Sequence, residues 1–145
     1  IAKIREIDSD AIIICGTPTW SQDVDTVVKD PIKNYKNIMY TLHFYAGTHK
    51  EYLRNKAQIA IDAGLPLFVT EFGISDASGN GNLDEQEGNI WIDFLNKNNI
   101  SWVCWNLSNK NESSSLISSS TNKITGWDNS ELSDEGRWLL KALKK

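Results

Sequence analysis

Residues 38–73, IMYTLHFYAGTHKEYLRNKAQIAIDAGLPLFVTEFG, decide the fold of this chain. The stretch begins and ends in short runs rich in β-branched and aromatic residues, which are typical of strands. Between these runs, Thr48 and Glu51 have the spacing of a capping box, and an apolar stripe follows at helical spacing, which predicts a helix over 50–63. A strand, a helix and a second strand in this order indicate two parallel strands with the helix packed outside them.

The same alternation extends toward both ends of the chain. Further strand-like runs lie at 11–15 and 102–107, so that four runs begin roughly 30 residues apart, the spacing of βα units in a barrel. A second capping box, Asn82 to Glu85, predicts the next helix, and Ser133 is placed to cap a last one. The predicted order is a short helical segment, then strand and helix four times.

The length of the chain sets how much of a barrel it can form. A barrel of eight βα units needs about 250 residues, and 145 residues hold four units. The fold class is therefore α/β, and the expected architecture is half of a (β/α)8 TIM barrel, formed by a single domain over 1–145. Four parallel strands leave two open edges and an uncovered apolar face, so we expect a partner to complete the barrel, either the missing half or a second copy of this chain.

Composition excludes several classes of protein. The chain is 40% hydrophobic and 23% charged, which is ordinary for a globular domain, and its net charge of -4 argues against nucleic acid or an anionic membrane as a partner. Cys15 and Cys104 lie in apolar runs and no Cys/His cluster has zinc spacing, so we expect buried free thiols, no metal and no cofactor. Because the chain opens on Ile1 and shows no leader, we expect a processed, truncated or deliberately cut chain.

Polar and aromatic side chains gather where the predicted strands end. In chain order they are Trp20 after the first strand, His43 and Tyr45 at the end of the second, Glu71 at the end of the third and Trp105 at the end of the fourth. In a parallel αβ barrel the active site is built at this face. A carboxylate in an apolar strand is costly unless it is paired or functional, which makes Glu71 the strongest single candidate.

Each of these residues also has a structural interpretation. The strand carboxylate could belong to a buried hydrogen-bond network, and a lone histidine on a strand is more often a core residue. A single tryptophan usually packs in the core, whereas Trp20 and Trp105 could instead stack on sugar rings. Lys110 and Glu112 follow the fourth strand closely, either as solvated loop charges or as hydrogen-bond partners of sugar hydroxyls.

Four motifs in this order resemble glycoside hydrolase family 5, and within it the bacterial endo-β-1,4-glucanases, or cellulases. They are GTPTWSQDV at 16–24, HFY at 43–45, VTEFG at 69–73 and the spacing Trp105-x-x-x-x-Lys110-x-Glu112. The resemblance covers essentially the whole chain. It implies a retaining, secreted cellulase that acts on β-glucan, built on a (β/α)8 barrel of which this chain is the carboxyl-terminal half, strands five to eight.

The resemblance also implies a role for each candidate residue. Glu71 matches the catalytic nucleophile, Tyr45 the tyrosine that hydrogen-bonds it, and His43 the active-site histidine beside it. Among the substrate-binding residues, Trp105 matches the platform beneath the sugar next to the cleaved bond, and Trp20 an aromatic on the leaving-group side. The matches to polar contacts on the non-reducing side are Lys110 and Glu112.

One departure from the family decides what the chain can do alone. The acid/base Glu that the family carries at the end of strand four has no counterpart here, because that strand belongs to the amino half of the barrel. We therefore expect the isolated chain to be inactive or nearly so. The alternative function is a catalytically silent half-barrel fragment that binds glucan or self-associates.

Overall fold

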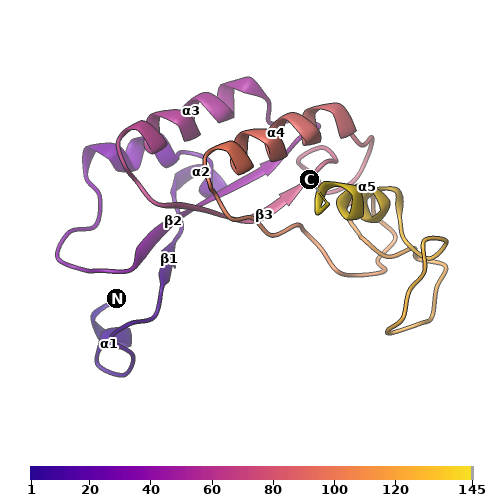
Figure 1. Ribbon diagram of the computed structural model, residues 1–145, viewed down its shortest axis with the longest axis horizontal. Helices are drawn as coiled ribbons and strands as arrows, with labels where there is room; N and C mark the ends of the chain where they lie inside the picture. The colour runs from indigo at the N-terminus through magenta and orange to yellow at the C-terminus, as the bar shows by residue number, and fades with distance from the viewer. Residues whose placement is uncertain (145) are drawn as a thin grey trace.

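The computed structural model describes residues 1–144 and contains a three-stranded parallel sheet (Figure 1). Its strands are β1 (Ile13–Cys15), β2 (Ile38–Tyr45) and β3 (Leu67–Gly73), in the order β1-β2-β3. They coincide with the first three predicted runs. Because neighbours in sequence are also neighbours in the sheet, each crossover moves one strand further in the same direction, as in the wall of a barrel.

One helical segment precedes the first strand, and others follow each strand. In chain order they are α1 (Ala2–Arg5), α2 (Pro18–Ser21), the 3₁₀ helix η1 (Val24–Lys29), α3 (Glu51–Asp62), α4 (Glu85–Lys97) and α5 (Asp134–Ala142). The last three correspond to the three predicted helices. None of the helices within residues 1–144 is long and apolar enough to span a membrane.

The helix starts confirm one predicted cap and correct two. Ser133 caps α5 as predicted, because its Oγ accepts a 2.9 Å hydrogen bond from the Gly136 N–H. Helix α3 has no side-chain cap, since the Thr48 hydroxyl instead accepts the N–H of Ala77 in a distant loop. Helix α4 is capped by Asp84 and not by the residue two positions earlier. Both predicted capping boxes are therefore wrong, although both helices are present.

Aromatic packing joins the helices to one face of the sheet. Helices α3 and α4 run along the same side of the strands in Figure 1. The ring of Phe44 in β2 stacks on Trp91 of α4 with centroids 4.0 Å apart, and Phe72 in β3 meets the edge of Trp138 of α5 at 6.3 Å. All four side chains are at most 2% exposed. Burying aromatic area of this size is what fixes the helices to the strands.

The fourth predicted strand is not a regular strand. Within the described residues, 102–107 pairs with β3 only through an isolated parallel bridge between Trp102 and Val69 and one more backbone bond, from the Trp105 N–H to the Phe72 carbonyl at 2.8 Å. The segment runs beside β3, and within residues 1–144 no strand lies on its other side. After Trp105 the backbone turns to a later loop, where the Asn106 N–H donates to the Ser114 carbonyl at 2.8 Å, so the run does not continue as a strand beside β3.

Apolar side chains are exposed along both edges of this arrangement. Beside β1, Ile12 is 64% exposed and Ile14 37%, and along the opposite edge Val103 is 52% and Leu107 69% exposed. The thiols of Cys15 and Cys104 are free, as predicted, but both residues are only partly buried. Helices thus cover one face of the sheet, and apolar side chains remain exposed along both of its edges.

Candidate active site

All seven residues that the sequence singles out line one cleft. The cleft has a volume of about 800 Å³ and lies at the carboxyl ends of β2 and β3. The seven are Trp20, His43, Tyr45, Glu71, Trp105, Lys110 and Glu112. Residues up to 92 positions apart in the sequence meet there because parallel strands bring their carboxyl ends to the same edge of the sheet.

An irregularity in β3 aims the carboxylate at this cleft. Thr41 of β2 pairs with Phe68, but His43 pairs with Glu71, so three steps along β3 match two steps along β2. The extra residue in β3 places both Thr70 and Glu71 on the face that carries His43. A bulge commonly re-aims a side chain in this way next to an active site.

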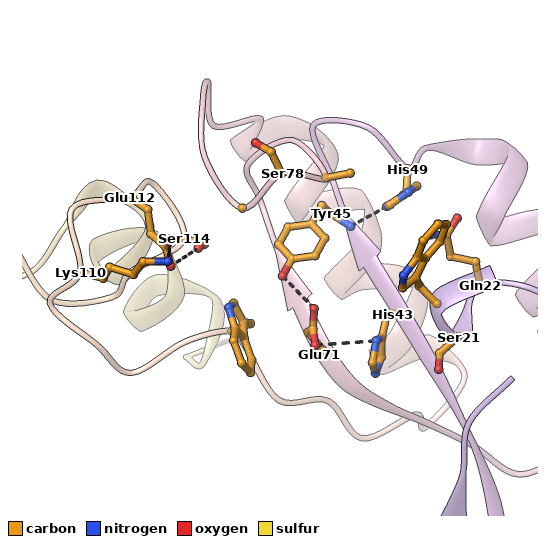
Figure 2. Close-up of a pocket in the computed structure, with 14 residues that line it drawn as sticks. Ser21, Gln22, His43, Tyr45, His49, Glu71, Ser78, Lys110, Glu112 and Ser114 are labelled. Atoms are coloured by element: carbon orange, nitrogen blue, oxygen red, sulfur yellow. Dashed lines mark hydrogen bonds and ion pairs between the residues drawn. The ribbon is translucent and has the colours of Figure 1, made fainter. Parts of the chain in front are cut away.

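Glu71 lies between two side chains of β2. The Tyr45 hydroxyl donates a 2.9 Å hydrogen bond to Oε1 of Glu71, and Nδ1 of His43 lies 3.7 Å from Oε2 (Figure 2). Burial raises the pKa of Tyr45 far above its ordinary value, and the hydrogen bond to Glu71 raises it further. The phenol therefore stays protonated and can only donate to the carboxylate.

His43 is held as a neutral ring. Burial lowers its pKa, and the attraction of the Glu71 carboxylate opposes this effect only in part. Its Nε2 lies 2.8 Å from the Thr70 hydroxyl, which also contacts the hydroxyl of Thr41. Thr70, the residue that the bulge brings to this face, thus fixes the orientation of the imidazole.

The two candidate platforms are exposed and not packed in the core. The side chain of Trp20 is 84% exposed and that of Trp105 is 46% exposed, and both border the cleft. By contrast Trp91 and Trp138 are almost fully buried. An indole that is exposed at a cleft can contact a flat apolar ligand.

Charged side chains border the cleft beyond the carboxylate. Nζ of Lys110 lies 2.6 Å from Oε2 of Glu112. The hydrogen bond from Lys110 lowers the pKa of Glu112, so this carboxylate stays ionised. Figure 2 shows this pair on one side of Glu71, with Gln22 on the opposite side. The cleft therefore has polar partners on both sides of the central carboxylate.

Several residues that line the cleft were not predicted from the sequence. They are Ser21, Gln22, His49, Ala77, Ser78, Gly79 and Ser114. His49 is the most informative, because its Nδ1 accepts the backbone N–H of Tyr45 at 2.8 Å and thereby ties the end of β2 to the loop that follows. Burial lowers the pKa of His49, so the ring is neutral. Its position four residues after Tyr45, at a strand's carboxyl end, is a signal that could have found it.

Other carboxylates near the cleft are held as anions. Asp23 accepts hydrogen bonds from Lys56 and Thr19, and these lower its pKa. Asp76 accepts from the side chain and backbone of Ser78, with the same effect. Such groups do not hold a proton that they could donate. In residues 1–144 there is no group of three or more His, Cys, Asp or Glu side chains that could hold a metal ion.

Comparison with known proteins places this geometry in a family. The chain is 48% identical over 143 residues to an endoglucanase from Clostridium saccharobutylicum, a match that covers 99% of this chain and 32% of that protein. A solved structure from Cytophaga hutchinsonii superposes with a TM-score of 0.94 at 45% identity and covers 99% of this chain and 46% of that one.

A second solved structure contains a bound ligand. The catalytic domain of Thermobifida fusca endoglucanase Cel5A, in complex with cellotetraose, is 31% identical with a TM-score of 0.93, over 100% of this chain and 50% of that domain. The chain thus spans about a third of the first curated relative and about half of these solved structures. Residues 1–111 match the model of the protein family described as Cellulase (glycosyl hydrolase family 5). The chain belongs to glycosyl hydrolase family 5, whose members are (β/α)8 barrels.

Proposed function

We propose that this chain is the carboxyl-terminal half of an endo-β-1,4-glucanase barrel and supplies its nucleophile. One observation carries the proposal. Glu71 ends a parallel strand with one carboxylate oxygen held at 2.9 Å by the Tyr45 hydroxyl, in a cleft bordered by exposed Trp20 and Trp105. A positioned carboxylate between aromatic platforms is suited to attack a sugar ring lying on those platforms.

The substrate proposed is a β-1,4-glucan. Several curated relatives are named endoglucanases, and one related catalytic domain was solved with cellotetraose. In this chain Trp105 would support the sugar beside the cleaved bond and Trp20 a sugar on the leaving-group side. Lys110 and Glu112 offer a cation and an anion to sugar hydroxyls on the non-reducing side.

The reaction proposed is hydrolysis with retention. A carboxylate oxygen of Glu71 forms a bond to the anomeric carbon while the bond to the leaving sugar's oxygen breaks, which gives a covalent glycosyl-enzyme. The leaving oxygen takes a proton from a second carboxylic acid. The resulting carboxylate then removes a proton from a water molecule, whose oxygen bonds to the anomeric carbon as the bond from that carbon to Glu71 breaks. Tyr45 keeps the nucleophile oriented. Since Asp23, Asp76 and Glu112 are held ionised, the second carboxyl is assigned to the amino half.

The partner proposed is the other half of the barrel. Exposed Ile12 and Ile14 at one edge and Val103 and Leu107 at the other are the side chains that two further strands would cover. An amino-terminal half supplies those strands together with the acid/base, whereas a second copy of this chain supplies only the strands. The complete protein acts outside the cell, as expected for an enzyme on an insoluble polysaccharide.

A direct test uses the completed barrel, meaning this chain joined to an amino-terminal half with the other four βα units. We expect it to hydrolyse carboxymethyl-cellulose and cello-oligosaccharides, with the β-anomer released first in proton NMR. A folded completed barrel that leaves both substrates intact, or releases the α-anomer first, would contradict the proposal. If the chain alone binds cello-oligosaccharides without any turnover in the completed barrel, the silent binding fragment becomes the better description.

A further inference from the structure

The segment that carries Trp20 has an unusual backbone. Thr19, Trp20 and Ser21 have φ angles of 54°, 51° and 63°, so three consecutive residues occupy the left-handed region. None of them is glycine, and Thr19 is β-branched, the type of side chain for which this region is least favourable. Such conformations persist only where the surrounding structure holds them. Contacts elsewhere in this chain must therefore stabilise the turn.

Packing of the indole cannot be what holds it. Trp20 is 84% exposed, whereas Trp91, an indole that does anchor its element, is fully buried. A ring with so little contact surface contributes little energy toward fixing its own backbone. Its direction must be set by the residues on either side of it.

Asp23 makes the contacts that the turn needs. Its Oδ2 accepts a 2.5 Å hydrogen bond from the Thr19 hydroxyl, and its backbone N–H donates to the Pro18 carbonyl at 3.1 Å. Its Oδ1 accepts a 2.5 Å hydrogen bond from Nζ of Lys56. One side chain thus closes the turn around Trp20 and ties it to a helix. Because both partners favour the anion, the pKa of Asp23 is lowered.

The anchor at the far end of this contact is rigid. Lys56 lies on α3, whose other face is fixed to the sheet by fully buried Leu53, Ala57 and Ala60. The residue after Asp23, Val24, is also fully buried in the core. The turn is therefore held between a packed helix and a packed valine. Its backbone is closed by hydrogen bonds from the Ser21 and Gln22 N–H groups to carbonyls of residues 17–19, and the Asp23 side chain ties this closed turn to α3.

We propose that Asp23, fixed by Lys56, is a positioning residue that holds the Trp20 ring at the cleft and so sets the affinity for sugars on the leaving-group side. The inference rests on the proposed function, because it takes Trp20 as a sugar platform. Asp23 itself is not among the residues that line the cleft. In this inference Asp23 acts only through the turn that carries the indole. Once Trp20 is removed, replacing Asp23 should therefore have no further effect on sugar affinity, which would not hold if Asp23 had only a general stabilising role.

The experiment is a double-mutant cycle in the completed barrel, with Asp23→Ala, Trp20→Ala and the double variant. We expect Asp23→Ala to raise KM for cello-oligosaccharides roughly 3- to 10-fold with kcat within about twofold, and Trp20→Ala to raise it at least as much. The double variant should match Trp20→Ala alone, because contacts acting through one group are not additive. In protein labelled with 5-fluorotryptophan, the fluorine signal of Trp20, assigned with Trp20→Phe, should broaden or move in Asp23→Ala.

Two lysines give a matched control. Lys56→Met should reproduce most of the Asp23→Ala effect. Lys50→Met should leave KM unchanged, because Lys50 makes an ion pair of similar length with Asp84 at the start of the same helix, away from the turn. If Asp23→Ala does not fold, Asp23→Asn and Lys56→Met carry the test, since Asn keeps the volume and can still accept from Thr19.

The outcomes separate this inference from the proposed function. A completed barrel without glucanase activity, or unchanged KM in Trp20→Ala, overturns the proposed roles on which it rests. A Trp20→Ala effect without any effect of Asp23→Ala, Asp23→Asn or Lys56→Met overturns the positioning role alone. Additive effects of Asp23→Ala and Trp20→Ala also overturn it, since Asp23 would then act on something other than the indole.

Discussion

The Tyr45 hydroxyl donates a 2.9 Å hydrogen bond to Oε1 of Glu71 across two adjacent parallel strands. The pair does not face each other in the ladder, because Tyr45 pairs with Gly73 and Glu71 with His43. A side chain at position 73 would meet the Tyr45 ring, since a Cβ there would lie 3.0 Å from two of its carbons. The glycine therefore leaves room for the phenol to lean along the strand and reach the carboxylate.

Replacing Glu71 by Gln removes the nucleophile but keeps its shape. In the completed barrel we expect kcat on cello-oligosaccharides to fall by more than about 10³-fold, while the affinity for the same ligands changes little. Stopped assays and calorimetric titration measure the two quantities on one preparation. Glu51→Gln, an exposed carboxylate on α3, is the control and should retain full activity. Substantial turnover by the Gln variant would remove Glu71 from the mechanism.

Replacing Tyr45 by Phe removes the hydroxyl that donates a hydrogen bond to Glu71. Among the described residues, no other neutral group donates to this carboxylate at hydrogen-bond distance. A hydrogen bond to a charged group contributes about 1.5–3 kcal/mol, so kcat should fall roughly 10- to 100-fold with a small change in KM. Steady-state kinetics of the completed barrel decide the matter. Tyr52→Phe is a suitable control, because that phenol is on the exposed side of α3. An unchanged kcat would show that Glu71 is oriented by other contacts.

Replacing Trp105 by Ala tests whether its side chain supports the sugar beside the cleaved bond. Burying an aromatic side chain contributes about 1.5–3 kcal/mol, so Trp105→Ala should weaken binding of cello-oligosaccharides roughly 10- to 100-fold. Trp127 lies in the loop between the fourth run and α5, outside the residues that line the cleft, and Trp127→Ala should bind normally. Equal losses in both variants would point to a general effect on folding and not to stacking.

The strands and the site could be predicted from the sequence for the same reason. Apolar runs of strand length alternate with helical stripes, and side chains at the ends of parallel strands meet at one edge, so residues as distant as Trp20 and Glu112 could be assigned to a common site. Ser133 was predictable as a cap because its partner, the Gly136 N–H, is local in sequence.

The errors involve partners that are distant in sequence. Thr48 has the right spacing for a cap, yet its hydroxyl is used by Ala77 in another loop. The bulge that turns Thr70 and Glu71 to one face depends on the register with β2, which no pattern within β3 reveals. The run at 102–107 has the composition of a strand, but its pairing with β3 ends at Trp105, because the backbone of Asn106 bonds to Ser114 and Leu116 in a later loop, which the pattern of the run does not reveal.

Glu135 makes stability depend on pH in a specific direction. It is fully buried, Oε1 accepts the Ile74 N–H at 3.0 Å, and Oε2 has no partner among the described residues. Burial raises its pKa to about 7, against an ordinary value of 4.5. Between these two values the folded state binds more protons than the unfolded state. The contribution of Glu135 to stability is therefore full at about pH 4.5 and is lost as the pH rises to about 7.

The difference between the parent and Glu135→Gln isolates this effect, because His43 and His49, whose pKa values are lowered, act in the opposite direction in both proteins. We expect Glu135→Gln to gain on the order of 3 kcal/mol relative to the parent between pH 4.5 and pH 7.5. Urea unfolding of the completed barrel at the two pH values measures it. A constant difference across this range would mean that Glu135 ionises at its ordinary pKa.

The isolated chain should be inactive, or nearly so, and should not remain a plain monomer. Glu71 has no acid/base partner in the described residues, and general acid assistance is worth roughly 10²- to 10⁴-fold, so turnover of soluble glucan should fall at least that far below the completed barrel. Exposed Ile12, Val103 and Leu107 leave apolar surface at both edges of the sheet, which favours pairing of two copies. Such a pair closes the edges but brings two nucleophiles and no acid, so it should gain stability without gaining activity. Light scattering and a reducing-sugar assay on one sample check both parts, and a stable monomer as active as the completed barrel would contradict both.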